Sequence, residues 1–241
     1  MSQTSPSEGS AVRWVRRSLW DVVPRDHRQS DAALRRRQVV TVAVVVVGAI
    51  VLGFSLRIEA GNPLFYPATL VLAAVWAVGA FASGPLHLGR ISGGGRPGRL
   101  VRPVLAPILL GLGLAALFVV GGLVVREIPW LEQQVRSVTE IADQGSLPIL
   151  LVVTAVNGVA EELFFRGAAY AALPRHPVLW TSVAYVLATL ATGNVMLAFA
   201  AILLGVVVGL ERRASGGVLA PILTHCAWSL SMLVALPLLF G

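Results

Sequence analysis

The chain has 241 residues, of which 56% are hydrophobic and only 13% are charged. Ordinary soluble domains carry about 25% charged residues, so this composition excludes that class. The net charge of +7 comes from arginine alone, because the sequence contains no lysine. The arginines lie in loops beside apolar runs, which favours a role in membrane topology, and we expect no nucleic-acid partner.

The first residues of the chain are polar and rich in arginine. They contain no small-residue cleavage site after an apolar run, so no cleavable signal peptide is predicted. We interpret residues 1–37 as a cytosolic, partly disordered leader and residues 38–241 as a transmembrane helical domain. Within the leader, residues 11–23 mix Trp14 and Trp20 with arginines. This pattern fits an interfacial amphipathic helix and a basic tail that only enforces orientation equally well.

Seven apolar runs approach or exceed the roughly 20 residues that a helix needs to cross a bilayer. The fifth and sixth apolar runs are short, and only a few residues separate them. The sequence therefore predicts an all-α, polytopic transmembrane helix bundle of about seven spans. The predicted spans cover residues 39–56, 64–82, 104–125, 147–165, 178–191, 195–210 and 218–240.

The positions of the arginines predict the orientation of the bundle. With the N-terminus in the cytosol, eight arginines precede the first span, four lie between spans two and three, and two lie in each later cytosolic loop. Only Arg57, Arg126 and Arg136 then remain outside. The positive-inside rule thus favours a cytosolic N-terminus and an external C-terminus.

Three ionisable groups lie inside the predicted spans, namely Glu161, Glu162 and His225. Such groups are costly in a membrane and usually mark function or a necessary pairing. From the helical rise, Glu161 and His225 lie about 9 and 10 Å from the cytosolic face. The equal depth predicts one shared polar site. The alternative to a shared site is that the glutamates belong to a structural anchor at the end of one span, while His225 donates a hydrogen bond between helices.

Local spacing adds detail to this site. Arg166 follows Glu162 by four residues, the favourable order for a helical ion pair, which leaves Glu161 to face the bundle. Asn157 precedes Glu161 by one turn and is placed to hydrogen-bond it. A carboxylate near an imidazole can activate water and stabilise an oxyanion. Ser229, one turn after His225, is expected to face the same groove.

Two motifs carry a family resemblance. Residues 161–166 read Glu-Glu-Leu-Phe-Phe-Arg, which matches Glu-Glu-x-x-x-Arg in full, and residues 216–225 look like the approach to a final His-x-x-x-Asn motif. Over about residues 147–235, the chain resembles the CAAX-protease and bacteriocin-processing (CPBP, or Abi) family of intramembrane proteases. The resemblance implies that Glu161 is a general base that activates water, that Glu162 supports it, and that His225 binds the oxyanion.

The chain departs from the family pattern at two positions. Thr189 stands where the middle motif, Phe-x-x-x-His, has histidine, and Tyr185, otherwise expected to be a packing residue, stands at its phenylalanine. Ser229 stands at the final asparagine. Threonine is neither an imidazole base nor a good metal ligand. Members of the family are described both as zinc enzymes and as glutamate-dependent proteases, so zinc held by His225 and Glu161 is the one candidate cofactor.

The leading hypothesis is an intramembrane endopeptidase that hydrolyses a membrane-associated peptide or protein near the cytosolic side through glutamate-activated water. The intact glutamate motif favours this enzyme. The missing histidine favours a catalytically inactive binding or scaffold protein of the same fold. A small transporter would use Glu161 as a proton carrier. The expected surroundings are the lipid bilayer of a bacterial plasma membrane.

Overall fold

The computed structural model describes residues 9–24, 27–55, 58, 62–93, 98–143 and 146–241. Most residues in these ranges lie in helices, and strands β1 (Ile91–Ser92) and β2 (Leu100–Val101) form one short antiparallel pair. The predicted all-α class is confirmed. The helices are α1 (Ser10–Leu19), α2 (Asp31–Ser55), α3 (Phe65–Ser83), α4 (Leu105–Val125), α5 (Pro129–Asp143), α6 (Leu147–Glu162), the π-helix η1 (Leu163–Ala169), α7 (Tyr170–Ala172), α8 (Pro177–Leu190), α9 (Val195–Ser215) and α10 (Leu219–Phe240).

Six helical stretches of the described chain are long and apolar enough to cross a membrane: α2, α3, α4, the continuous helix Leu147–Ala172, α9 and α10. Many of their large apolar side chains are exposed, as on a surface that faces lipid. The polytopic membrane bundle is thereby confirmed. α8 has only 14 residues, about 21 Å of helix against a core of about 30 Å, so the count of seven spans stays a prediction.

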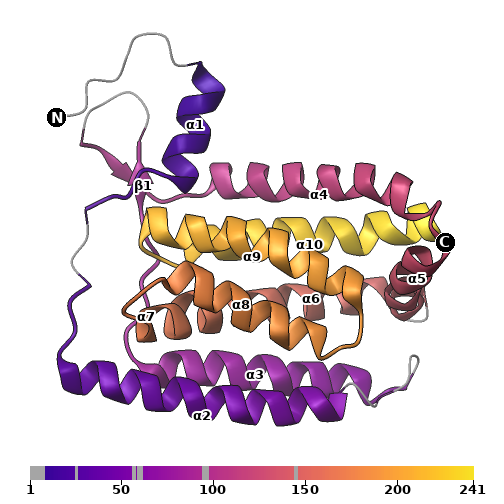
Figure 1. Cartoon of the computed structure of the whole chain (residues 1–241), viewed down its shortest axis with the longest axis horizontal. Coiled ribbons are helices and arrows are strands. Elements are labelled where there is room, and N and C mark those ends of the chain that lie inside the picture. Colours follow the sequence, from indigo (N-terminus) through magenta and orange to yellow (C-terminus); the bar gives the residue numbers. More distant parts are fainter. Residues whose placement is uncertain (1–8, 25–26, 56–57, 59–61, 94–97, 144–145) are drawn as a thin grey trace.

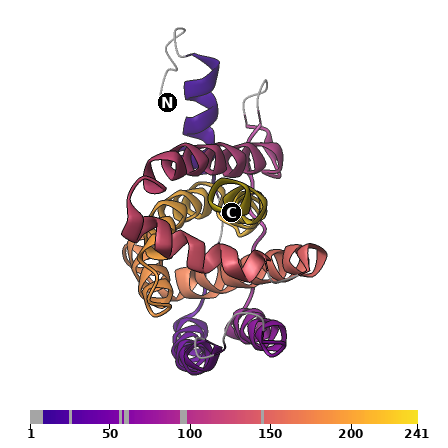
Figure 2. The same ribbon diagram turned by 90° about the vertical axis from the view of Figure 1, so that its right-hand side faces the viewer.

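The long helices run side by side along one axis (Figure 1). α2 and α3 form a pair along one edge, while α4 and α10 lie along the opposite edge. The described parts of the arginine-rich connections lie at one end of the bundle. At the other end, near the C-terminus, α5 crosses the ends of the spans (Figure 2). The two ends of the bundle therefore differ in charge. Which end faces the cytosol stays a prediction from the arginine positions.

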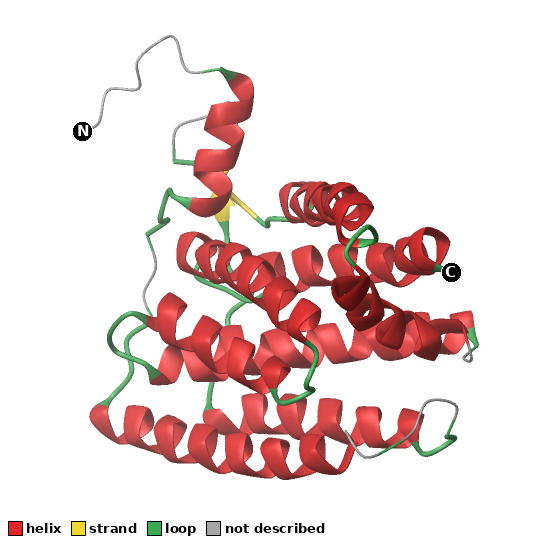
Figure 3. Ribbon diagram, turned by 45° about the vertical axis from the view of Figure 1, so that its right-hand side comes forward, coloured by secondary structure: helices red, strands yellow, loops and turns green. Residues whose placement is uncertain are grey.

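The leader contributes helix in two places. α1 stands across the direction of the spans (Figure 3), and Arg213 of α9 lies over the Trp20 ring beside it, 5.8 Å from the ring centroid. Of the two interpretations of residues 11–23, this orientation fits the interfacial helix. α2 begins at Asp31, before the predicted leader boundary at residue 37. The Ser30 hydroxyl accepts a hydrogen bond from the amide of Ala33 at 3.2 Å and starts the helix there.

Aromatic packing holds α3 against η1. The Trp76 ring lies 4.7 Å from that of Phe164 and 5.5 Å from that of Phe165, measured between centroids. Gly48 of α2 makes room for the indole, since a Cβ at this position would collide with the ring. The contact joins the α2–α3 pair to the helix that carries both glutamates.

The connection from α3 to α4 pairs with the turn between α9 and α10. The amide of Val218 donates to the carbonyl of His87 at 2.8 Å. Gly89, with φ of 82°, and Gly217 approach so closely that a Cβ on either would collide with the backbone of the other. This pairing fixes the start of α10, two turns before His225.

Candidate functional site

Two basic side chains share one buried carboxylate. Oε1 of Glu162 accepts hydrogen bonds from Nη1 of Arg166 at 3.1 Å and from Nδ1 of His225 at 2.8 Å. Glu162 and Arg166 are both 0% exposed. Because the carboxylate oxygen accepts both bonds, Nδ1 of His225 carries the proton of their bond. The other ring nitrogen, Nε2, is left for a further partner.

Helix geometry explains why these groups meet. The ion pair joins residues four apart, as predicted from their spacing. α6 ends at Glu162, and the chain continues as η1, a type of helix that occurs often at functional sites. Gly158 brings α10 close, because a Cβ there would already lie 3.6 Å from Cδ2 of His225. A larger side chain at this position would displace the imidazole.

Arg166 is held from several sides. Its Nη2 donates to the carbonyl of Gly205 in α9 at 3.4 Å, and its guanidinium carbon lies 4.8 Å from the ring centroid of Tyr185 in α8. Its own carbonyl accepts a hydrogen bond from Nε of Arg212 at 2.6 Å. The guanidinium therefore fixes Glu162 relative to α8 and α9, and through Glu162 it also fixes His225.

Glu161 has different surroundings from Glu162. Its side chain is only half-buried, and it forms no ion pair with any residue that the structure describes. Tyr185, His225 and Arg166 are the polar and charged groups around it. The geometry thus separates a paired carboxylate, Glu162, from an unpaired one next to it in the chain, as the sequence predicted.

Asn157, predicted as a supporting residue, and Thr189, predicted as a catalytic residue, both bond within their own helices. The Asn157 amide donates to the carbonyl of Val153 at 2.9 Å, so the proposed hydrogen bond to Glu161 is not formed. The Thr189 hydroxyl donates to the carbonyl of Tyr185 at 2.9 Å. Both follow the common habit of short polar side chains in helices, which bond to the carbonyl one turn earlier.

Ser229 is not brought together with His225. Its hydroxyl donates to the carbonyl of Cys226 at 3.4 Å, and its side chain lines a separate apolar cavity between α4, α5, α9 and α10. One turn along α10 carries it away from the glutamates, toward the end of the bundle that α5 covers. The expected common groove of Ser229 and His225 is therefore not observed.

Sequence reasoning missed three polar residues near this site: Tyr185, Glu211 and Arg212. The sixth span was predicted to end at residue 210, but α9 continues to Ser215 and buries Glu211 (1% exposed) and Arg212 (5% exposed) inside the bundle. Neither carboxylate oxygen of Glu211 has a hydrogen-bond partner in the described structure. The signal was Gly216, a left-handed helix cap that marks where α9 ends.

The donor set does not fit zinc. A zinc site in a protein takes three or four nitrogen, sulfur or oxygen ligands. Within the described ranges, no group of three or more histidine, cysteine, aspartate or glutamate side chains is close enough to hold a metal ion. His225 already uses Nδ1 for Glu162, and Thr189 adds no imidazole. The candidate pair of His225 and Glu161 is therefore too small a ligand set.

Comparison with known sequences identifies the family. The profile of the type II CAAX prenyl endopeptidase Rce1-like family matches residues 143–231. No curated protein and no solved structure matches the chain. The matched segment begins at the end of α5, contains Glu161, Glu162 and His225, and ends within α10, and it supports a CAAX-type intramembrane protease fold. This Rce1-like segment therefore supports the CAAX-protease family that the motifs resemble.

Proposed function

We propose that this membrane protein is an intramembrane endopeptidase that hydrolyses a peptide bond with water activated by Glu161. The observation that carries the proposal is the unequal pairing of two adjacent carboxylates. Glu162 is buried and bound to Arg166 and His225, while Glu161 is half-buried and unpaired in the described structure. An unpaired carboxylate beside an oriented imidazole is the arrangement that general-base hydrolysis needs.

In the proposed reaction, Glu161 takes a proton from water as the water oxygen attacks the substrate carbonyl carbon. The carbonyl oxygen becomes an oxyanion, and His225, as an imidazolium with a proton on Nε2 as well as on Nδ1, stabilises it by donating from Nε2. The proton on Glu161 then passes to the leaving nitrogen as the peptide bond breaks. Glu162 and Arg166 are positioning residues, because they hold the imidazole through Nδ1 and do not touch the substrate.

The substrate that we propose is a membrane-associated peptide or protein, cleaved near the cytosolic side. The family name refers to CAAX prenyl substrates. Protein prenylation is chiefly eukaryotic, whereas the absence of lysine and the abundance of Ala, Val and Gly favour a bacterial source. We therefore assign the protein to a bacterial plasma membrane and leave the prenyl group out of the proposed substrate.

The test is cleavage of membrane-anchored peptides by the full-length protein in liposomes, with and without a chelator. Glu161→Gln keeps the size of the side chain but cannot accept the proton, so we expect the rate to fall by about 10²- to 10⁴-fold. The variant should insert and fold as the wild type does, since it carries no buried charge in place of the carboxylate. Undiminished cleavage by Glu161→Gln would exclude this mechanism.

One observation favours the inactive scaffold as a second candidate. Thr189 bonds to its own helix and supplies no imidazole where the family motif has one. The variant Thr189→His restores that pattern and separates the two candidates. An enzyme should keep or gain activity with this histidine. A scaffold should show no cleavage of any peptide in the wild type, and cleavage only, if at all, in Thr189→His.

A further inference from the structure

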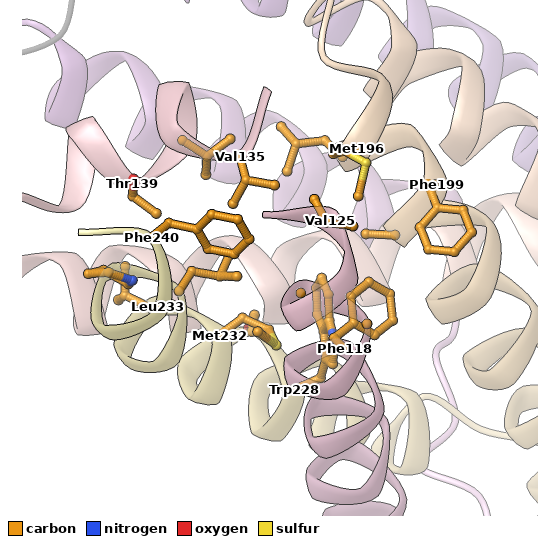
Figure 4. A pocket seen from close by; sticks show the side chains of 18 of the residues that line it. Phe118, Val125, Val135, Thr139, Met196, Phe199, Trp228, Met232, Leu233 and Phe240 are labelled. Atoms are coloured by element: carbon orange, nitrogen blue, oxygen red, sulfur yellow. The ribbon is translucent and has the colours of Figure 1, made fainter. Parts of the chain in front are cut away.

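An apolar cavity of about 520 Å³ lies between α4, α5, α9 and α10. Figure 4 shows side chains from these helices, among them Phe118, Val135, Phe199 and Phe240, around it. The cavity occupies the half of the bundle remote from the arginine-rich connections. We infer that it is a binding site for one hydrocarbon chain of a bilayer lipid.

The lining offers water few polar groups, one of them the indole Nε1 of Trp228, which has no hydrogen-bond partner in the described structure. Its polar side chains are Thr139, Thr154, Ser229 and the indole of Trp228. The Thr139 hydroxyl donates to the carbonyl of Arg136 at 3.0 Å, and the Ser229 hydroxyl also bonds to its own helix. Cavities lined by apolar groups stay dry, because a buried water needs two to four polar partners. An apolar molecule is therefore the natural occupant.

The cavity is elongated along α10. Its lining runs from Trp228 to Phe240, which corresponds to about 18 Å of helix axis. A non-helical peptide would bring backbone N–H and C=O groups that find no partners there. A single hydrocarbon chain brings no such groups.

The position of α5 indicates where the chain comes from. α5 crosses the end of the bundle, and its residues Val135 and Thr139 line the cavity (Figures 2 and 4). Next to them on the same helix, Glu132 and Arg136 form an ion pair with half-exposed side chains at 2.9 Å. A helix that carries both apolar and charged side chains across the end of a bundle fits a membrane surface. The lipid therefore belongs to the leaflet on the α5 side, with its headgroup near α5.

The test uses a phosphatidylcholine that carries a photoreactive diazirine at the end of one acyl chain. The full-length protein is placed in liposomes that contain this lipid and no substrate, irradiated, and mapped by peptide mass spectrometry. We expect the label to concentrate on α4 and α10 residues of the lining, and less on equally apolar outer surfaces such as that of α2. Labelling spread evenly over all lipid-facing helices would overturn the inference.

A matched pair of variants on α4 sharpens the test. Gly121 lines the cavity, Gly113 does not, and a Cβ at either position would meet no atom within 4 Å. Gly121→Phe should fill part of the cavity, so the label on the lining residues should be lost relative to the label on the outer surface of α2. Gly113→Phe should leave the labelling unchanged.

Equal labelling in both variants, or label found mainly on a co-purified protein, would also overturn the inference. The wild-type label map remains decisive if Gly121→Phe fails to fold, and neither readout depends on protease activity.

Discussion

Nδ1 of His225 and Oε1 of Glu162 lie 2.8 Å apart, although the two residues are 63 positions apart in the chain. The bond ties α10 to the end of α6 inside the bundle. It also decides which glutamate orients the imidazole: the second of the pair, which Arg166 holds as well. The first glutamate therefore keeps its carboxylate for other chemistry.

Loss of the buried ion pair should destabilise the protein strongly. Arg166→Met leaves the Glu162 carboxylate buried without its cation, which typically costs about 3–5 kcal/mol. The chain provides a matched control, because Glu132 and Arg136 also form a Glu–Arg pair four residues apart, with side chains 29% and 49% exposed. Arg136→Met should cost less than about 1 kcal/mol. Denaturant unfolding in mild detergent measures both, and similar losses for the two variants would contradict the assigned role of Arg166.

Two residues one turn apart on α10 should behave differently in the cleavage assay. His225→Ala removes the proposed oxyanion donor, for which a loss of about 10²- to 10³-fold in rate is expected. Ser229→Ala should leave the rate close to that of the wild type, because Ser229 lines the separate cavity. If Ser229→Ala were as damaging as His225→Ala, the two residues would share a site after all.

Stability should depend on pH through His87, which lies in the connection after α3. Burial, assisted by Arg212 and Arg37, lowers the pKa of His87 below its ordinary value of 6.5. The unfolded chain then binds the proton more tightly than the folded chain, so stability falls as the pH drops through 6.5 toward the lowered pKa. Above that window both states are neutral at His87, and its contribution is constant.

Thermal unfolding at pH 8 and pH 5.5 measures this effect. Its size should be small, because the ring is largely exposed, although it stacks on His27 at 3.9 Å. His87→Asn should reduce the difference between the two pH values. His176→Asn serves as the control, because His176 has a positive φ of 49°, which asparagine tolerates. A pH dependence unchanged in His87→Asn would show that other groups cause it.

The seven-span topology predicts which loops face the cytosol. Reporter fusions after Arg175 should read as cytosolic, and fusions after Glu127 and Gly241 as external. The physical reason is the arginine distribution, with sixteen arginines on the predicted inner side and three outside. Cytosolic readings after both Arg175 and Gly241 would mean that α8 does not cross the membrane.

The sequence predicted the helices well, because bilayer thickness sets a length that apolar runs must match. The ends were less predictable. α9 runs five residues beyond its predicted end at 210, since charged side chains such as those of Arg212 and Arg213 can lie in a helix end where they find partners. Arg212 finds the carbonyl of Arg166 and the ring of Tyr170, neither of which can be inferred from hydropathy.

At the site, spacing within one helix predicted the pair of Glu162 and Arg166 correctly. Depth alone placed His225 level with Glu161, but it could not say which glutamate the ring would bind, because rotation about the helix axis was unknown. Tyr185 was expected only to pack, yet it lies between Arg166 and Glu161. Its contacts depend on the rotation of α8 about its own axis. That rotation is set by contacts between helices, which cannot be inferred from one sequence.

The π-helical turn of η1 limits what a motif match can guarantee. A π-helical turn holds one residue more than an α-helical turn. Deleting one residue after Gly167 would leave all six letters from Glu161 to Arg166 intact. The helix would then wind back to ordinary α-helical pitch with α7 in its present place, and the side chains of η1 would point in other directions around the axis. Two relatives with identical letters at this motif can thus differ in which side of the helix meets α8, and counting residues through η1 matters as much as reading them.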